Sequence, residues 1–205
     1  MRASKGYHAG VVRSYWEQAE ATHGDMSGES FEFYATQISE ILGAPGTAGL
    51  VLDHGAGDGR IGSLLIAQGY SVEFSEFAPQ FVERIAAAGQ RCYPSDDVPE
   101  GRFDTVFVNN AIFYVHPSEL LGEIGWLLRR LRAGGRLLLL DVPTIQRESR
   151  LRAGPALRLV HRLTLVHQPQ AGGFFVDERR IRKAFRDVRI GPSWCDYRAH
   201  IEIRT

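Results

Sequence analysis

Residues 51–60 read VLDHGAGDGR. A short apolar run at the start of this stretch is followed by glycines at positions 55, 57 and 59. An apolar run of this length that ends in turn residues is typical of a buried parallel strand. Glycine has no Cβ, so it is the residue found where a ligand lies close to the backbone. The stretch therefore predicts a strand followed by a ligand-binding turn, and the neighbouring residues must decide which ligand the turn accepts.

Strand and helix patterns alternate along the chain after this turn. Short apolar runs predict strands, whereas apolar residues three and four positions apart predict helices. The predicted strands cover residues 50–55, 70–76, 91–94, 103–109 and 135–142, and the predicted helices cover 60–69, 78–89 and 117–131. This alternation is typical of a doubly wound, Rossmann-like α/β fold, in which helices cover both faces of a mostly parallel sheet.

The segments outside this core complete one domain, because 205 residues are too few for two domains of ordinary size. We expect an N-terminal helical cap over residues 1–48, a ligand-binding core over 49–142 and an Arg-rich insertion over 143–176 that lies across the ligand-binding face. A C-terminal helix and hairpin then occupy 177–205.

Helical spacing predicts two helices before the first strand, at residues 14–21 and 30–42. Near the other end, a helix at 176–185 has Asp177 as its expected cap. The last residues predict two strands joined by a turn at the Gly-Pro-Ser sequence of 191–193.

The composition excludes several classes of protein. No apolar run approaches the roughly 20 residues of a membrane helix, and the first residues lack the apolar core of a secretory signal, so we expect a cytoplasmic protein. Lys plus Arg equal Asp plus Glu at 24 each, so no global field attracts nucleic acid or an anionic membrane. Cys92 and Cys195 are far apart and have no metal-type spacing, so we expect neither a disulfide nor a metal site.

The spacing of the glycines separates the candidate ligands. The dinucleotide fingerprint is G-x-G-x-x-G, but this turn reads G-x-G-x-G and carries Asp53 and Asp58, which suit a pyrophosphate poorly. The Gly-Lys-Ser/Thr ending of a phosphate loop is missing. Glu76, at the end of the second predicted strand, is placed to accept hydrogen bonds from ribose hydroxyls, and Phe77 offers an apolar face to an adenine ring. Together these residues predict a nucleoside that carries a positively charged substituent.

Four segments in this order, VLDHGAGDGR, VEFSEFAPQFVE, FDTVFVNNAIFYV and LLRRLRAGGRLLLLDV, resemble the class I S-adenosylmethionine (SAM)-dependent methyltransferase superfamily. The resemblance covers roughly residues 50–142 and is weaker in residues 176–185 and the final strands. It implies a seven-stranded sheet with an antiparallel last strand and SAM as the cofactor, which leaves the reaction as S-adenosylhomocysteine (SAH).

The resemblance also implies a role for each matching position in this sequence. It places Asp53, Gly55, Ala56 and Gly57 against the methionine portion, Glu76 on the ribose, Phe77 beside the adenine, one of Ser95, Asp96 and Asp97 on the adenine amino group, and Asn109 and Asn110 beside the methionine portion.

Some features depart from the family pattern or have a simpler explanation. His54 stands where the family more often has a small or aliphatic residue, and the connection from Ser95 to Phe103 is short. Asp58 could equally cap the helix that follows it. Aromatic residues at helical spacing near the N-terminus are more often core than binding surface, so we expect only Tyr15 or its neighbour Trp16 to cover the cofactor.

The chemistry of methyl transfer limits what side chains must do. A methyl group on sulfonium is already activated, so the protein must align the acceptor in line with it and exclude water. An oxygen acceptor also needs a base, for which the candidates are His161, His167, His116, Asp141 and Tyr114, although His116 is expected above all to start the helix after the fourth strand.

These observations predict a SAM-dependent methyltransferase that acts on a small molecule, by O- or N-methylation of a sugar or secondary metabolite. A methyltransferase of protein acceptors and a non-catalytic SAM-binding module remain alternatives, and an oxidoreductase is disfavoured by the glycine spacing. Residues 147–162 carry five arginines and one glutamate, which could bind an anionic group of the acceptor or form a solvated helix face. The acceptor, the base and the oligomeric state are left open.

Overall fold

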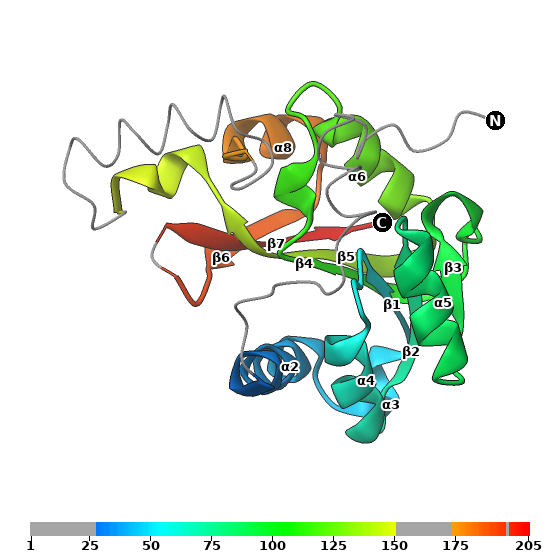
Figure 1. Ribbon diagram of the computed structural model, residues 1–205. Helices are drawn as coiled ribbons and strands as arrows, with labels where there is room; N and C mark the ends of the chain where they lie inside the picture. The colour runs from blue at the N-terminus through cyan, green and yellow to red at the C-terminus, as the bar shows by residue number, and fades with distance from the viewer. Residues whose placement is uncertain (1–27, 151–173, 196) are drawn as a thin grey trace.

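The computed structural model describes residues 28–150, 174–195 and 197–205. Within them the chain forms one seven-stranded sheet in the order β3-β2-β1-β4-β5-β7-β6 (Figure 1). Strands β1 to β5 are parallel, whereas β7 runs antiparallel to both of its neighbours, β5 and β6. The strands are β1 (Leu50–His54), β2 (Ser71–Glu76), β3 (Cys92–Pro94), β4 (Phe103–Asn109), β5 (Leu131–Pro143), β6 (Val188–Pro192) and β7 (Arg198–Arg204).

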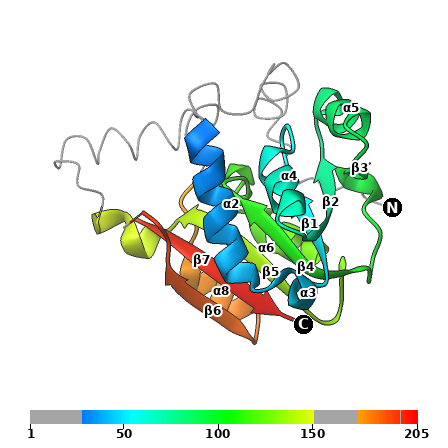
Figure 2. The same ribbon diagram turned by 90° about the horizontal axis from the view of Figure 1, so that it is seen from below.

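Helices cover both faces of this sheet, as Figures 1 and 2 show. The α-helices are α2 (Gly28–Leu42), α3 (Pro45–Ala48), α4 (Arg60–Ala67), α5 (Pro79–Ala87), α6 (Leu120–Leu128) and α8 (Glu178–Ala184). Short 3-10 helices, η1 (Ser95–Asp97), η2 (Ile112–Tyr114) and η3 (Ile145–Arg150), follow β3, β4 and β5. Helices α2 to α5 pack on one face, and α6 and α8 pack on the other. No helix in the described part of the chain is long and apolar enough to cross a membrane.

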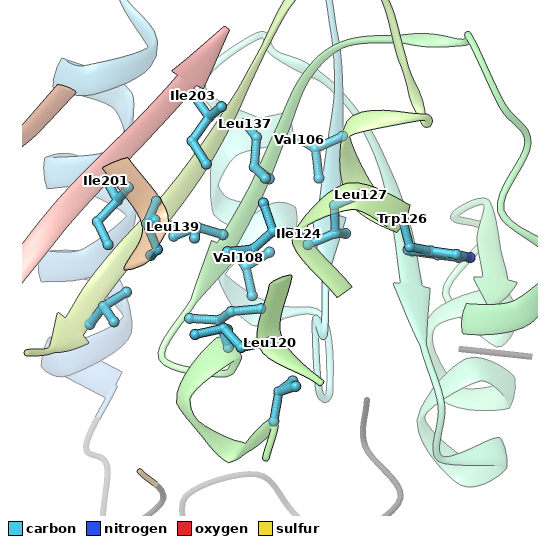
Figure 3. Packing of buried hydrophobic residues seen from close by; sticks show 14 of the residues in the cluster. Val106, Val108, Leu120, Ile124, Trp126, Leu127, Leu137, Leu139, Ile201 and Ile203 are labelled. Carbon is cyan, nitrogen blue, oxygen red and sulfur yellow. The ribbon is translucent and has the colours of Figure 1, made fainter. Parts of the chain in front are cut away.

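The two faces have separate hydrophobic cores because side chains alternate along each strand. In β5, Leu137 and Leu139 pack under α6, whereas Leu138 and Leu140 pack on the face of α2 and α4. Figure 3 shows the first of these cores, in which Ile124 of α6 lies among side chains of β4, β5 and β7. A strand that is buried on both sides reads as a continuous apolar run, which explains the sequence RLLLLDV of β5.

The predicted fold class and the order of elements are confirmed, and the differences lie at the ends of elements. Helix α6 is shorter than the predicted 117–131, and β5 begins at Leu131 because that residue pairs with Phe103 before the register shifts. The predicted turn at 191–193 is wrong, since Gly191 and Pro192 still pair with β7 and the hairpin loop is 193–197.

Packing of α4 on β2 explains why residue 62 is glycine. A Cβ built on Gly62 would overlap the ring of the buried Phe74 and crowd the carboxylate of Asp53. Gly122 of α6 is exposed, and a Cβ there would meet nothing within 4 Å. The two helical glycines therefore form a matched pair for measuring the close approach of α4.

We predict that Gly62→Ala lowers the free energy of unfolding by about 1–3 kcal/mol, the usual cost of overpacking. Gly122→Ala should raise it by about 0.4–1 kcal/mol, because alanine reduces the freedom of the unfolded chain. Urea unfolding measures both values. Equal effects of the two substitutions would show that α4 does not need a glycine against Phe74.

Candidate functional site

An open cleft lies at the carboxyl ends of β1 and β4, where the order of strands reverses, which is the usual ligand-binding position of such a sheet. This glycine-loop cleft has about 430 Å³ of empty volume. It is lined by Phe31, Asp53, Gly55, Ala56, Gly57, Asp58, Arg60, Ile61, Asn109 and Asn110. The structure therefore brings together the predicted residues of β1 and its turn with the predicted asparagines of β4.

Backbone hydrogen bonds hold the turn after β1 against the end of β2. The N–H groups of Gly55 and Ala56 donate to the carbonyl of Ser75, at 2.9 and 3.2 Å. Gly55 and Gly57 have φ values of 71° and 57°, in the left-handed region that favours glycine. The alternating glycines thus let the backbone turn sharply and leave the cleft wall without side chains at these positions.

The carboxylate of Glu76 is part of this turn. Gly57 N–H donates to its Oε2 at 2.8 Å, and the N–H groups of Phe77 and Ala78 donate to its Oε1 at 2.7 and 3.1 Å. Burial raises the pKa of Glu76, although these three hydrogen bonds act to lower it. Glu76 therefore has the predicted position at the end of β2, and it also fastens the glycine loop to that strand.

Asp53 is the buried acid of β1 nearest the cleft. Only 4% of the residue is exposed, and its Oδ2 has no hydrogen-bond partner among the described residues. Burial, together with the charge of Glu76, raises the pKa of Asp53 to about 8, and the backbone of Gly62 opposes this. Burial and the same two acids raise the pKa of the Cys92 thiol to about 12. The interior beside the glycine loop therefore favours a positive charge.

Arg60 supplies a cation at the rim of the cleft. Its guanidinium lies 4.8 Å from the ring centre of Phe31 in α2, and its Nε lies 2.9 Å from Asp58 Oδ2. Asp58 therefore pairs with Arg60, and the N-cap residue of α4 is Gly59. Sequence reasoning missed Arg60 and Phe31 as site residues. The position of Arg60 directly after the glycines was an available signal, whereas Phe31 lies on α2 at the spacing of a core residue.

The residues predicted for the adenine lie at the carboxyl end of β3. Ser95 is buried, and its Oγ has no hydrogen-bond partner in the described part of the chain. Asp96 and Asp97 are exposed, and Phe77 is half-buried beside Glu76. An unsatisfied buried hydroxyl needs a partner, so the structure favours Ser95 among the three alternatives.

Asp141, a predicted base, belongs to a buried network. Its carboxylate accepts hydrogen bonds from Arg198 Nη1 at 2.7 Å, Ser193 Oγ at 2.5 Å and the hydroxyl of Tyr34 at 3.3 Å. Arg198 Nη1 also donates to Asn110 Oδ1 at 2.5 Å. We call these five residues the Arg198 network. The carboxylate of Asp141 is fully buried and these hydrogen bonds occupy its oxygens, so an acceptor cannot reach it directly, which argues against its predicted role as a base.

The other predicted bases lie elsewhere. Tyr114 is half-buried on η2, with its ring 4.6 Å from that of Phe113, and is not among the residues that line the glycine-loop cleft. His116 Nδ1 is 2.7 Å from Ser118 Oγ, and its carbonyl accepts the N–H of Leu120, which agrees with its predicted place before α6. His161, His167 and Tyr15 lie outside the described residues, as do Trp16 and most of the predicted cap and insertion.

His54, the departure from the family pattern, is fully buried beneath the glycine loop. Its Nδ1 lies 2.8 Å from Ser75 Oγ, and its Nε2 lies 3.7 Å from Glu123 Oε1 of α6. It therefore joins the ends of β1 and β2 from the face opposite to α4.

The chain resembles known proteins in both sequence and fold. A model of a family described as a methyltransferase domain matches residues 26–188. The chain belongs to this methyltransferase family. With the observed sheet order, this match identifies a class I SAM-dependent methyltransferase, with SAM as its methyl donor. No curated protein matches the chain.

Solved structures share the fold of this methyltransferase at low sequence identity. A SAM-dependent methyltransferase from Archaeoglobus fulgidus superimposes with a TM-score of 0.62 at 12% identity, over 86% of this chain and 95% of that one. Magnesium protoporphyrin IX methyltransferase from Synechocystis, with bound SAH, gives 0.56 at 17% identity, over 95% and 85% of the two chains. The 1,6-didemethyltoxoflavin-N1-methyltransferase from Burkholderia thailandensis, with bound 1,6-didemethyltoxoflavin and SAH, gives 0.54 at 20% identity, over 98% and 84%.

The raised pKa of Asp53 predicts how stability depends on pH. Its value rises from 3.8 to about 8 on folding, so the folded protein binds this proton more tightly than the unfolded chain does. The resulting stability is complete below about pH 4 and is lost as the pH rises through about 8.

We therefore expect Asp53→Asn, which cannot ionise, to gain stability relative to the parent protein between pH 5 and pH 8. Urea unfolding at several pH values measures the difference, and Asp97→Asn, at an exposed position, is the control. A difference between Asp53→Asn and the parent that stays constant with pH would contradict the raised pKa.

Proposed function

We propose that this methyltransferase transfers the methyl group of SAM to a small-molecule acceptor, by O- or N-methylation of a sugar or secondary metabolite. The observation that carries the proposal is the buried, unpartnered carboxylate oxygen of Asp53 beside an open glycine loop. A buried acid with a raised pKa gains most from a cationic ligand. SAM carries an ammonium and a sulfonium, so its charge fits this site.

Each part of SAM can be assigned to residues of the cleft or of the neighbouring ends of β2 and β3. We assign the methionine portion to Asp53, Gly55, Ala56 and Gly57 with Asn109 and Asn110, the ribose to Glu76, and the adenine to Phe77 and Ser95. Glu76 already accepts two backbone N–H groups on Oε1 and one on Oε2, so Oε2 keeps an acceptor position for a ribose hydroxyl. When bound, SAM supplies a methyl group that its sulfonium has already activated.

Arg60 completes this assignment. The lining of the cleft includes both Asp53 and Arg60, and an amino acid carries one ammonium and one carboxylate. We assign the carboxylate of the methionine portion to the guanidinium of Arg60. Its side chain is 52% exposed and shared with Asp58, so we expect a modest contribution to affinity.

The small-molecule acceptor is supported by two structural neighbours. One is named for 1,6-didemethyltoxoflavin, a small molecule that it binds together with SAH, and the other for magnesium protoporphyrin IX. Burial, and then the charge of Asp141, raise the pKa of Tyr34, so this phenol stays protonated and is poorly suited to act as a base. An amine or heterocyclic nitrogen, which needs no base before transfer, therefore suits the described residues better than a hydroxyl.

Binding of the cofactor tests the proposal first. Calorimetric titration should show micromolar affinity for SAM and SAH and none for NADH. Gly57→Val should abolish binding because the side chain would fill the loop, whereas Glu76→Ala should weaken it by roughly 10- to 150-fold through lost hydrogen bonds to a charged group.

Gly89→Val is the matched control, since Gly89 also has a positive φ, of 79°, but a Cβ there meets nothing within 4 Å. Circular dichroism establishes that each variant is folded. Unchanged SAM affinity in a folded Gly57→Val protein would refute the assigned site. Binding of SAM without methylation of any amine, phenol, sugar or peptide acceptor would favour the non-catalytic module.

The role of Arg60 can be tested with a ligand that lacks one group. Arg60→Gln should weaken SAM by about fivefold, a typical value for a partly exposed charge pair. It should leave the affinity for decarboxylated SAM unchanged, because the interacting carboxylate is missing. Arg91→Gln, at an arginine that is 62% exposed, is the control. Equal losses for both ligands would assign Arg60 to another part of SAM.

A further inference from the structure

We propose that Arg198 is a positioning residue of the glycine-loop cleft, which holds Asn110 in the backbone conformation that SAM binding requires. The inference rests on the proposed function, because it concerns a wall of the same cleft. Arg198 begins β7, far along the chain from the glycine loop, and does not itself line the cleft.

A single nitrogen of Arg198 joins the ends of two strands. Its Nη1 donates to Asn110 Oδ1 at 2.5 Å, to Asp141 Oδ2 at 2.7 Å and to the carbonyl of Asp141 at 3.3 Å. Asn110 directly follows β4, and Asp141 lies in β5 where its pairing with β7 shifts register. The guanidinium thus connects β7 to the residue that lines the cleft.

The residues that Arg198 holds are backbone exceptions. Asn110 has a φ of 53° and Asp141 a φ of 55°, and they are the only residues other than glycine with positive φ in the described part of the chain. Asn and Asp adopt this conformation more readily than other side chains do, but it remains unfavourable and persists only where contacts stabilise it. Both exceptions accept hydrogen bonds from the same Arg198 nitrogen.

Burial makes this contact strong. Asp141 is fully buried, and the Arg198 side chain is 21% exposed, so the pair is shielded from water. His200 Nδ1 accepts a hydrogen bond from the backbone N–H of Asp141 at 3.2 Å, which also holds the backbone of Asp141 in place. A lysine at position 198 would keep the charge beside Asp141, but its ammonium ends one bond short of the position of Nη1 and cannot make the same three contacts in place.

The network also reaches α2, which supplies another lining residue of the cleft. Tyr34, which donates to Asp141, lies one helical turn after Phe31 on α2, and Phe31 lines the cleft. The ring of Trp194, in the loop before β7, packs 5.2 Å from that of Tyr34. Arg198 is therefore connected both to Asn110 directly and, through Asp141 and Tyr34, to the helix that carries Phe31.

Replacement of Asn110 by glycine distinguishes positioning from a general structural role. Glycine adopts positive φ without strain, so a cleft with glycine at position 110 no longer needs Arg198 to impose that conformation. The test measures SAH affinity by calorimetry in four proteins: the parent, Arg198→Lys, Asn110→Gly and the double variant. Arg136→Lys is the matched control, because Arg136 is a half-buried arginine that bonds the carbonyl of Leu42 and lies outside the cleft.

We expect Arg198→Lys to weaken SAH binding by about tenfold in the parent protein and by less than about twofold in the Asn110→Gly variant. Arg136→Lys should leave the affinity unchanged. An equal loss in both backgrounds, or no loss in a parent that binds SAH, would overturn the positioning role alone. A parent that does not bind SAH would overturn the proposed function and this inference together.

A second comparison keeps Arg198 intact, in case Arg198→Lys does not fold. Asn110→Ala and Asn110→Gly both remove the amide, but only alanine is strained at positive φ. Asn110→Gly should therefore bind SAH about tenfold more tightly than Asn110→Ala. Equal affinities of these two variants would show that the backbone conformation at residue 110 does not control binding.

Discussion

The hydrogen bond from Gly57 N–H to the buried carboxylate of Glu76 joins the two strand ends on which the cleft is built. The glycine loop follows β1, and Glu76 ends β2, so this contact fixes the loop relative to the neighbouring strand. It also keeps a second acid close to Asp53, whose pKa the charge of Glu76 helps to raise. The same contact thus sets both the shape of the loop and the electrostatic preference of the interior for a cation.

The charges around the cleft are arranged differently on its two sides. On the side of β1 and β2, no arginine or lysine of the described residues pairs with the buried carboxylates of Asp53 and Glu76, and in the proposed site the cation of SAM lies close to them. On the side of β4 and β5, Arg198 already neutralises Asp141. Burial works to lower the pKa of Arg198, but Asp141 and Tyr197 raise it above its ordinary value, so the guanidinium stays charged. In the proposed site, SAM therefore meets the charges of the first side, while the ion pair holds the second side in place.

The fold and the donor side of the site could be predicted from the sequence because their signals are local. The apolar run of β5, the glycines at 55 and 57, and Glu76 at a strand end are each recognisable within a few residues. The contacts of the Arg198 network could not be predicted in this way. Arg198 contacts Asn110 across 88 positions of sequence, and Asp141 was recognised as a strand-end acid without any sign that Arg198 and Ser193 would occupy it. Contacts between distant segments form only when the strands have taken their places in the sheet. The spacing of apolar residues predicts single helices and strands, but it does not predict these contacts.

A crystal structure of the complex with SAH is the most direct test that the glycine-loop cleft binds the cofactor. The account predicts the ribose hydroxyls on Glu76, the homocysteine ammonium beside Asp53 and its carboxylate beside Arg60, with Asn110 still at positive φ. SAH bound elsewhere, or bound in this cleft with Asp53 and Glu76 away from its polar groups, would contradict the central claim.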